Sequence, residues 1–83
     1  MEIKVLGPGC PKCKKLFSET VDAVASSGVS ADLRKVEAIE EIIQYGVMMT
    51  PALVIDGEVK ACGRVPERDE IAAWIAAAAK SSG

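Results

Sequence analysis

Two cysteines separated by two residues give this chain a pair of thiols that can act together. Cys10 and Cys13 enclose Pro11 and Lys12 in the stretch GPGCPKCKK. Three kinds of chemistry use such a pair: metal binding by thiolates, a structural disulfide, and electron exchange with another dithiol. The chain has three cysteines in all, and an odd count argues against a disulfide-stapled secreted domain. In a reducing compartment, a dithiol is more often redox-active or metal-binding than structural.

The position of the pair favours redox chemistry. Cys10 stands between an alternating apolar run and an amphipathic segment, so it is expected at the start of a helix. Unpaired N–H groups at a helix start stabilise a thiolate, and Lys12, Lys14 and Lys15 add positive charge nearby. Cys13, one turn further on, is expected on the buried face of the helix. These positions favour Cys10 as the nucleophile and Cys13 as the thiol that resolves a mixed disulfide.

The elements that must hold these residues follow from hydrophobic periodicity. Alternating apolar residues predict strands, and apolar spacings of three and four predict amphipathic helices. Asp56-Gly57 between two strand-like runs predicts a two-residue hairpin turn, and Pro66 is expected to open the last helix. The predicted strands are 1–6, 29–33, 51–55 and 58–62, and the predicted helices are 11–25, 38–45 and 66–80. The predicted buried residues of the first helix are Leu16, Phe17, Val21 and Val24.

The order β-α-β-α-β-β-α predicts an α/β fold. A strand–helix–strand unit is normally parallel and right-handed, whereas a hairpin is antiparallel. The result is a mixed four-stranded sheet with helices on both faces. The 83 residues are expected to form a single domain, 1–83, in which residues 81–83 fray.

Three motifs of the chain are similar to those of one family. They are CPKC between a strand and a helix, MMTPALVIDG before a hairpin, and GRVP before the last helix. They resemble the thioredoxin-like small redox-active disulfide proteins, which are glutaredoxin-sized members of the thioredoxin superfamily, and the resemblance spans nearly the whole chain. It implies a thioredoxin-like fold and thiol–disulfide oxidoreductase activity. Two departures are the lack of a Trp before Cys10 and the stretch ACGRVP in place of the Gly-Gly-Cys-Asp of glutaredoxins. Glutathione is therefore left open as a partner.

The resemblance also implies roles for the residues around Pro51. Position alone favours a trans peptide bond before Pro51, whereas the resemblance implies a cis-proline packed against the dithiol. By the same analogy, the backbone of Thr50 pairs with an extended segment of the substrate. The residues expected to support the site or to bind substrate are Gly7 to Gly9, Pro11, Lys12, Met49, Thr50, Pro51 and Gly63.

The third cysteine, Cys62, has two interpretations. Counting outward from the hairpin turn pairs Cys62 with Pro51 on the same sheet face. The favoured interpretation is a small buried residue at a strand end. The alternative is an accessory thiol that captures a disulfide or completes a three-thiolate metal site. Of Met48 and Met49, one is expected in the core and the other at the lip of the site.

Metal binding is the alternative function of the chain. Zinc sites usually have four ligands, and this chain offers three cysteines and no His. Cu(I) needs only two thiolates, so binding or carriage of Cu(I) or Zn stays open as the alternative. For the redox function no cofactor and no metal is expected, because the electrons reside in the Cys10–Cys13 pair.

Composition limits the partners. A net charge of −2 and three aromatic residues give no basis for nucleic acid or an anionic membrane as a partner. No apolar run approaches the roughly 18 residues that a membrane span needs, and the N-terminus lacks a signal-peptide pattern. We therefore expect a cytoplasmic monomer. Its expected partners are a disulfide-containing protein and an upstream thiol reductant or reductase.

Overall fold

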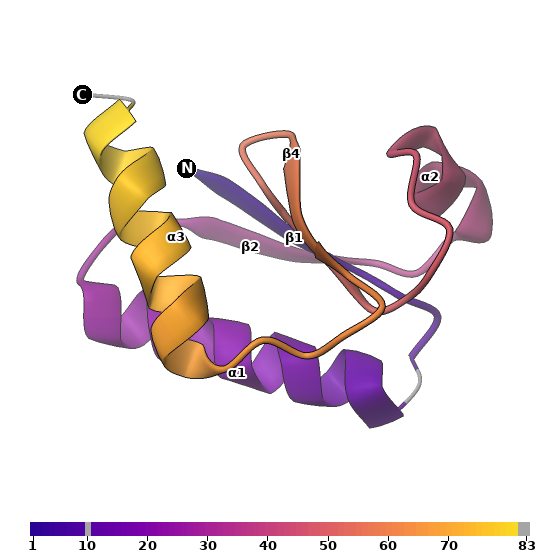
Figure 1. Ribbon diagram of the computed structural model, residues 1–83, viewed down its shortest axis with the longest axis horizontal. Coiled ribbons are helices and arrows are strands. Elements are labelled where there is room, and N and C mark those ends of the chain that lie inside the picture. The colour runs from indigo at the N-terminus through magenta and orange to yellow at the C-terminus, as the bar shows by residue number, and fades with distance from the viewer. Residues whose placement is uncertain (10, 82–83) are drawn as a thin grey trace.

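The computed structural model describes residues 1–9 and 11–81, and its elements follow the predicted order. A four-stranded sheet carries three helices (Figure 1). The strands are β1 (Glu2–Leu6), β2 (Asp32–Val36), β3 (Ala52–Ile55) and β4 (Glu58–Cys62), and the helices are α1 (Pro11–Ser27), α2 (Ile39–Gln44) and α3 (Arg68–Ser81). Within this part of the chain, no helix is both long and apolar enough to cross a membrane. The predicted α/β fold class is confirmed.

The sheet is mixed, with the strand order β2-β1-β3-β4. β1 pairs in parallel with β2 and antiparallel with β3, and β3 pairs antiparallel with β4. The parallel pair requires a crossover, which α1 provides. Because β1 is an inner strand that leads directly toward α1, the fold places the cysteine motif at the carboxyl end of β1.

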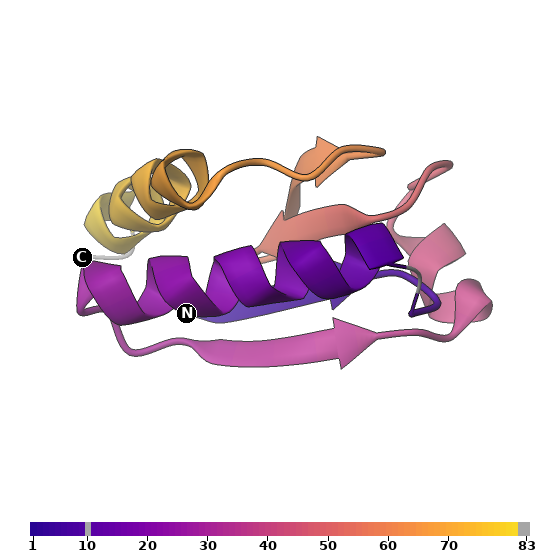
Figure 2. The same ribbon diagram turned by 90° about the horizontal axis from the view of Figure 1, so that it is seen from below.

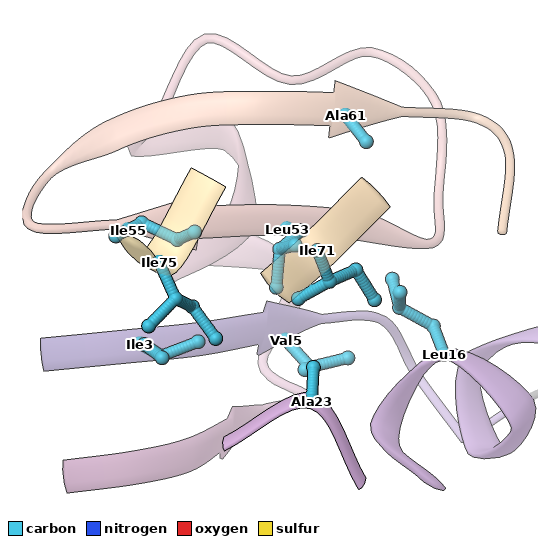
Figure 3. Packing of buried hydrophobic residues seen from close by; sticks show 9 residues of the cluster. All are labelled: Ile3, Val5, Leu16, Ala23, Leu53, Ile55, Ala61, Ile71 and Ile75. Atoms are coloured by element: carbon cyan, nitrogen blue, oxygen red, sulfur yellow. The ribbon is translucent and has the colours of Figure 1, made fainter. Parts of the chain in front are cut away.

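α1 and α3 cover one face of the sheet, and the short helix α2 packs at one end of the opposite face. Alternation along β1 and β3 turns one set of side chains toward α1 and α3, and Figure 3 shows this core from close by. Its buried members are Ile3, Val5, Leu16, Ala23, Leu53, Ile55, Ala61, Ile71 and Ile75. The opposite face carries a smaller cluster that includes Ile42 of α2: Leu6, Val36, Ile42, Val47, Ala52 and Val54. In Figure 2, α1 and α3 pack against each other, and α2 lies apart at the far end of the sheet.

The buried stripe of α1 is shifted around the helix relative to the prediction. Leu16 is fully buried and Phe17 partly buried, but Val21 is 42% exposed. Thr20 and Ala23 are buried instead, because they continue the series Cys13, Leu16, Thr20, Ala23, whose successive spacings of three and four keep it on one helix face. The Thr20 hydroxyl donates a hydrogen bond to the Leu16 carbonyl oxygen at 2.7 Å, which satisfies this polar group inside the core.

The hairpin turn forms as predicted. Asp56 and Gly57 have φ values of +49° and +82°, as a type I′ turn requires. The Asp56 carboxylate also accepts a hydrogen bond from the Glu2 backbone N–H at 2.8 Å. The turn is thereby fixed to the start of β1.

A β-bulge changes the register of the hairpin beyond the turn. The shift lies between Leu53 and Val54, and it places Ala52 opposite Cys62. The predicted pairing of Pro51 with Cys62 is therefore wrong by one residue. A bulge sets two residues of one strand against one of the other, so counting outward from the turn fails beyond it.

Two elements, β2 and α3, begin later along the chain than predicted, because contacts with distant segments determine where each one starts. β2 begins at Asp32 rather than at residue 29, since its pairing with β1 runs from Glu2 opposite Asp32 to the ends of both strands. α3 begins at Arg68 rather than at Pro66. The carboxylate of Glu19, on α1, accepts a hydrogen bond from the Arg68 backbone N–H at 3.0 Å, and it thus satisfies one of the unpaired donors of the α3 start.

Candidate active site

Cys13 lies in the first turn of α1, on the side that faces the protein interior. Its side chain is 5% exposed, in agreement with the predicted burial. α1 begins at Pro11, so Pro11, Lys12 and Cys13 form its first residues. Pro11 and Lys12 are exposed there. Cys10, the predicted nucleophile, lies outside the described residues.

Gly7 brings the end of the first strand against the sulfur of Cys13. A Cβ atom at Gly7 would overlap Cys13 Sγ, and it would lie 3.1 Å from Cys13 Cβ and 3.9 Å from Pro51 Cα. The Gly7 N–H donates a hydrogen bond to the Val36 carbonyl oxygen at 2.9 Å, which fixes Gly7 beside β2. The Thr50–Pro51 peptide bond is cis, and Pro51 is buried. Three segments of the chain thus converge at Cys13.

The loop before β3 and the end of β4 form one side of the site. The Gly63 N–H donates to the Pro51 carbonyl oxygen at 2.8 Å, and Cys62 Sγ donates to the Met49 carbonyl oxygen at 3.3 Å. Gly63 has a φ of +76°, and a Cβ there would lie 3.1 Å from Met49 Cβ. Glycine therefore permits both the turn and the close approach of the two segments. Thr50 is exposed beside them.

Cys62 and the two methionines differ from their predicted burial. Cys62 is a free, exposed thiol, so its favoured interpretation as a buried residue is wrong. Alternation along β4 buries Ala61 and turns its neighbour outward. Met48 is 95% and Met49 62% exposed, so neither fills the core. Val47 occupies the core position instead.

A small cavity of about 90 Å³ adjoins Cys13. Its lining combines backbone of the glycine-rich loop with charged side chains: Val5, Gly7, Gly9, Cys13, Lys14, Lys35 and Glu37. Lys35 also lies over the Phe17 ring, with its Nζ 4.6 Å from the ring centroid. Lys35 and Glu37 were not predicted from the sequence. The parallel pairing of Leu6 with Val36 brings these two residues to the site. A predicted register for β1 and β2 would have identified them.

The electrostatic environment of the α1 start is positive. The first turn of this 17-residue helix holds no acidic residue, and Lys12, Lys14 and Lys15 are exposed. A helix N-terminus carries roughly half a positive charge, which acts within about one turn. A thiolate at the start of α1 is therefore stabilised both by the helix and by the lysines, although solvent and salt weaken the contribution of the lysines.

A larger cavity, about 490 Å³, lies away from the thiols between α1 and the segment that precedes α3. It is lined by Lys15, Glu19, Asp22, Val65, Pro66, Glu67, Arg68 and Asp69. The lining of this cavity includes no cysteine, so the larger of the two cavities is not the one that adjoins the dithiol chemistry. Among the described residues, no group of three or more His, Cys, Asp or Glu side chains is arranged to hold a metal ion.

The chain matches a known family over most of its length. The family model for the thioredoxin domain covers residues 1–76, and these include every residue of the site described above. The chain belongs to the thioredoxin domain family. A thioredoxin of Methanothermobacter thermautotrophicus is 35% identical over 71 residues, which is 86% of this chain and 92% of that protein. A thioredoxin of Methanocaldococcus jannaschii is 33% identical over 69 residues, which is 83% of this chain and 79% of that protein.

Family membership confirms the predicted resemblance and supports thiol–disulfide oxidoreductase chemistry at the level of the thioredoxin family. It does not favour the alternative of metal carriage. The structure brings Gly7, Cys13, Pro51, Met49 and Gly63 to one end of the sheet. In this thioredoxin-family chain, the cysteine motif and the proline loop therefore meet where β1 ends.

Proposed function

We propose that the protein is a thiol–disulfide oxidoreductase that uses Cys10 as the nucleophile and Cys13 as the resolving thiol. The observation that carries the proposal is the placement of Cys13 Sγ against Gly7 and next to Pro51, at the first turn of α1. A thiol that is 5% exposed is poorly accessible to a bulky partner. It is nevertheless suited to attack the Cys10 sulfur of a mixed disulfide, because Cys10 precedes it by only three residues.

The proposed reaction has two exchange steps. The Cys10 thiolate attacks one sulfur of the partner disulfide, so a mixed disulfide forms and the other partner sulfur leaves as a thiolate, which takes up a proton. The Cys13 thiolate, having lost its proton to solvent, then attacks the Cys10 sulfur of the mixed disulfide, so that the bond from Cys10 to the partner breaks and the second partner sulfur leaves as a thiolate, which takes up a proton. The products are an oxidised Cys10–Cys13 pair and a partner that has gained two electrons and two protons.

The proposal needs no resident cofactor, because the dithiol itself stores the two electrons. An upstream dithiol reductant or reductase restores the reduced pair by the reverse exchange. The exposed backbone at Thr50, with Met49 and Gly63 beside it, is the proposed contact surface for an extended segment of the substrate. The hydrogen bond from the Gly63 N–H to the Pro51 carbonyl oxygen holds this loop beside the end of β4.

A redox titration tests the proposal. The protein is equilibrated in defined dithiothreitol buffers, and the Cys10–Cys13 pair is followed by thiol labelling and mass spectrometry. A midpoint near about −270 mV is expected of a reductant of the thioredoxin type, and one near about −120 mV of an oxidant. If no disulfide forms between the two cysteines at any potential, the proposal is wrong.

Single substitutions test the two roles. Cys10→Ser is expected to reduce disulfide turnover to the uncatalysed rate, because the attacking thiolate is lost. Cys13→Ser is expected to accumulate a covalent mixed disulfide, because the second exchange step is lost. The trap is made in a Cys62→Ser background, so that Cys10 is the remaining cysteine. Failure of this variant to form any adduct with a disulfide substrate contradicts the assigned order of attack.

A further inference from the structure

Exposed apolar side chains gather on one segment of the chain. Among the described residues, six large apolar side chains are exposed, and four of them lie between positions 39 and 49. These four are Ile39 (63%), Ile43 (64%), Met48 (95%) and Met49 (62%), and we call them the α2 apolar surface. Ile39 and Ile43 are four residues apart on α2 and therefore share one face of the helix. Single exposed apolar residues are ordinary, whereas a concentration of them marks an interaction site.

The α2 apolar surface is continuous along the chain with the proposed redox site. Met49 immediately precedes Thr50, and a Cβ added at Gly63 would lie 3.1 Å from the Met49 Cβ. Figure 1 shows α2 and the start of α1 at the same end of the molecule. The inward side of α2 is already occupied, since Ile42 packs in the smaller core cluster. The exposed face of α2 is therefore directed away from the fold and available for a partner.

Charges on the two sides of the site have opposite sign. Glu37, Glu40 and Glu41 are exposed around α2, and no Lys or Arg occurs between residues 36 and 59. On the other side, exposed lysines at 12, 14 and 15 surround the start of α1, where the first turn contains no acidic residue. A partner that lies across the site therefore meets a negative, apolar side and a positive side.

We propose that the α2 apolar surface is the docking site for a protein substrate whose disulfide is flanked on one side by apolar and basic residues. This inference rests on the proposed function, because it names the substrate class of the same site. Apolar contacts supply the affinity of such an interface, and complementary charge supplies association rate and orientation. The basic flank of the substrate lies over α2, so that its disulfide points toward the start of α1.

The test compares a small disulfide with two matched peptides. Hydroxyethyl disulfide carries neither an apolar segment nor a charge with which to bind the α2 apolar surface. Each peptide carries one disulfide followed by a leucine-containing segment, with several Lys residues in one peptide and several Glu residues in the other. We expect kcat/KM to favour the Lys peptide by about tenfold at low salt, and we expect this preference to shrink as salt screens the charges.

Two variants remove the two components of the surface. Ile43→Ser is expected to lower kcat/KM for the Lys peptide about tenfold and to leave turnover of hydroxyethyl disulfide unchanged. The pair Glu40→Lys and Glu41→Lys is expected to reverse the peptide preference. Matched controls are Val21→Ser, an exposed apolar residue on α1, and Glu58→Lys, an exposed charge on β4. Neither control is expected to alter the peptide preference.

The outcomes separate this inference from the proposed function. If hydroxyethyl disulfide is not reduced by the unaltered protein, the proposed function fails. If it is reduced but the peptides react equally, or Ile43→Ser loses nothing, the docking site is refuted. Sedimentation that shows a dimer broken by Ile43→Ser assigns the surface to a second copy of the chain and also refutes the proposal. If Ile43→Ser does not fold, the charge reversal at Glu40 and Glu41 decides.

Discussion

Replacing Gly7 by alanine tests the contact that defines the site. Gly7 is not among the glycines with a positive φ, so the backbone there accepts an alanine. The obstacle is Cys13, because an added Cβ would overlap its Sγ and lie 3.1 Å from its Cβ. Position 7 therefore requires glycine because of the Cys13 sulfur, and not because a turn demands a positive φ.

The magnitude follows from the size of the overlap. Inserting one methyl group into a well-packed position typically costs about 1–3 kcal/mol. The overlap involves a buried sulfur that sits in the first turn of α1, where it has little room to move, so we expect a loss near the upper end of that range. For a chain of this size, each kcal/mol lowers the melting temperature by about 4–8 °C.

A double-mutant cycle isolates the contact. The free energy of unfolding is measured by urea denaturation in excess dithiothreitol, so that all thiols are reduced. The four proteins are the unaltered chain, Gly7→Ala, Cys13→Ala and the double variant. In the Cys13→Ala background the sulfur is absent and only the 3.1 Å contact to Cβ and the 3.9 Å contact to Pro51 Cα remain. The cost of Gly7→Ala should then fall by about 1 kcal/mol or more.

Equal costs in the two backgrounds would refute the reasoning, because they would show that the backbone, and not the sulfur, demands glycine at position 7. Gly9→Ala is the comparison for a backbone requirement. Gly9 has a φ of +93°, and a Cβ added there would lie 3.7 Å from Glu37 Oε2. Its cost should therefore be independent of the residue at position 13.

Two further predictions concern the start of α3. Glu19→Ala should lower the free energy of unfolding by about 0.5–2 kcal/mol, because the Arg68 N–H loses its acceptor. Glu19→Gln keeps an acceptor oxygen at this position. If Glu19→Gln lowers stability in thermal unfolding as much as Glu19→Ala does, the capping role is contradicted. Arg64 donates hydrogen bonds of 3.0 and 2.9 Å to the Glu70 carboxylate, and these hold the pKa of Glu70 below its usual value. A carboxyl whose pKa is lower in the folded state adds stability above its unfolded pKa and loses it as the pH falls through its folded pKa. Glu70→Gln should therefore weaken the acid dependence of stability in denaturation curves recorded from neutral to acidic pH, whereas an unchanged dependence would show that the pair is not maintained in solution.

Local patterns in the sequence sufficed for the order of the elements and for the hairpin turn. The Asp56-Gly57 turn depends on positive φ angles at two adjacent residues, which is a local property of the sequence. The burial of Cys13 likewise follows from its position on a helix face. Such features are readable because no distant residue determines them.

The features that escaped prediction depend on contacts between distant segments. The start of α3 lies two residues beyond Pro66 because Glu19 of another helix supplies a hydrogen-bond acceptor. The pairing partner of Cys62 depends on a β-bulge, which the residues of the hairpin turn do not predict. The requirement for Gly7 depends on a sulfur six residues away that α1 folds back onto the strand. In each case the deciding partner is identified only once the chain is folded.

The charged outer strands have a consequence for how the molecule meets other chains. β2 and β4 form the two edges of the sheet, and each carries an exposed ion pair, Arg34 with Asp32 at 3.0 Å and Lys60 with Glu58 at 3.2 Å. Such surface pairs add little stability, but charges and a bulge along an edge hinder the addition of a foreign strand. We therefore expect the chain to resist edge-to-edge polymerisation into fibrils even at high concentration.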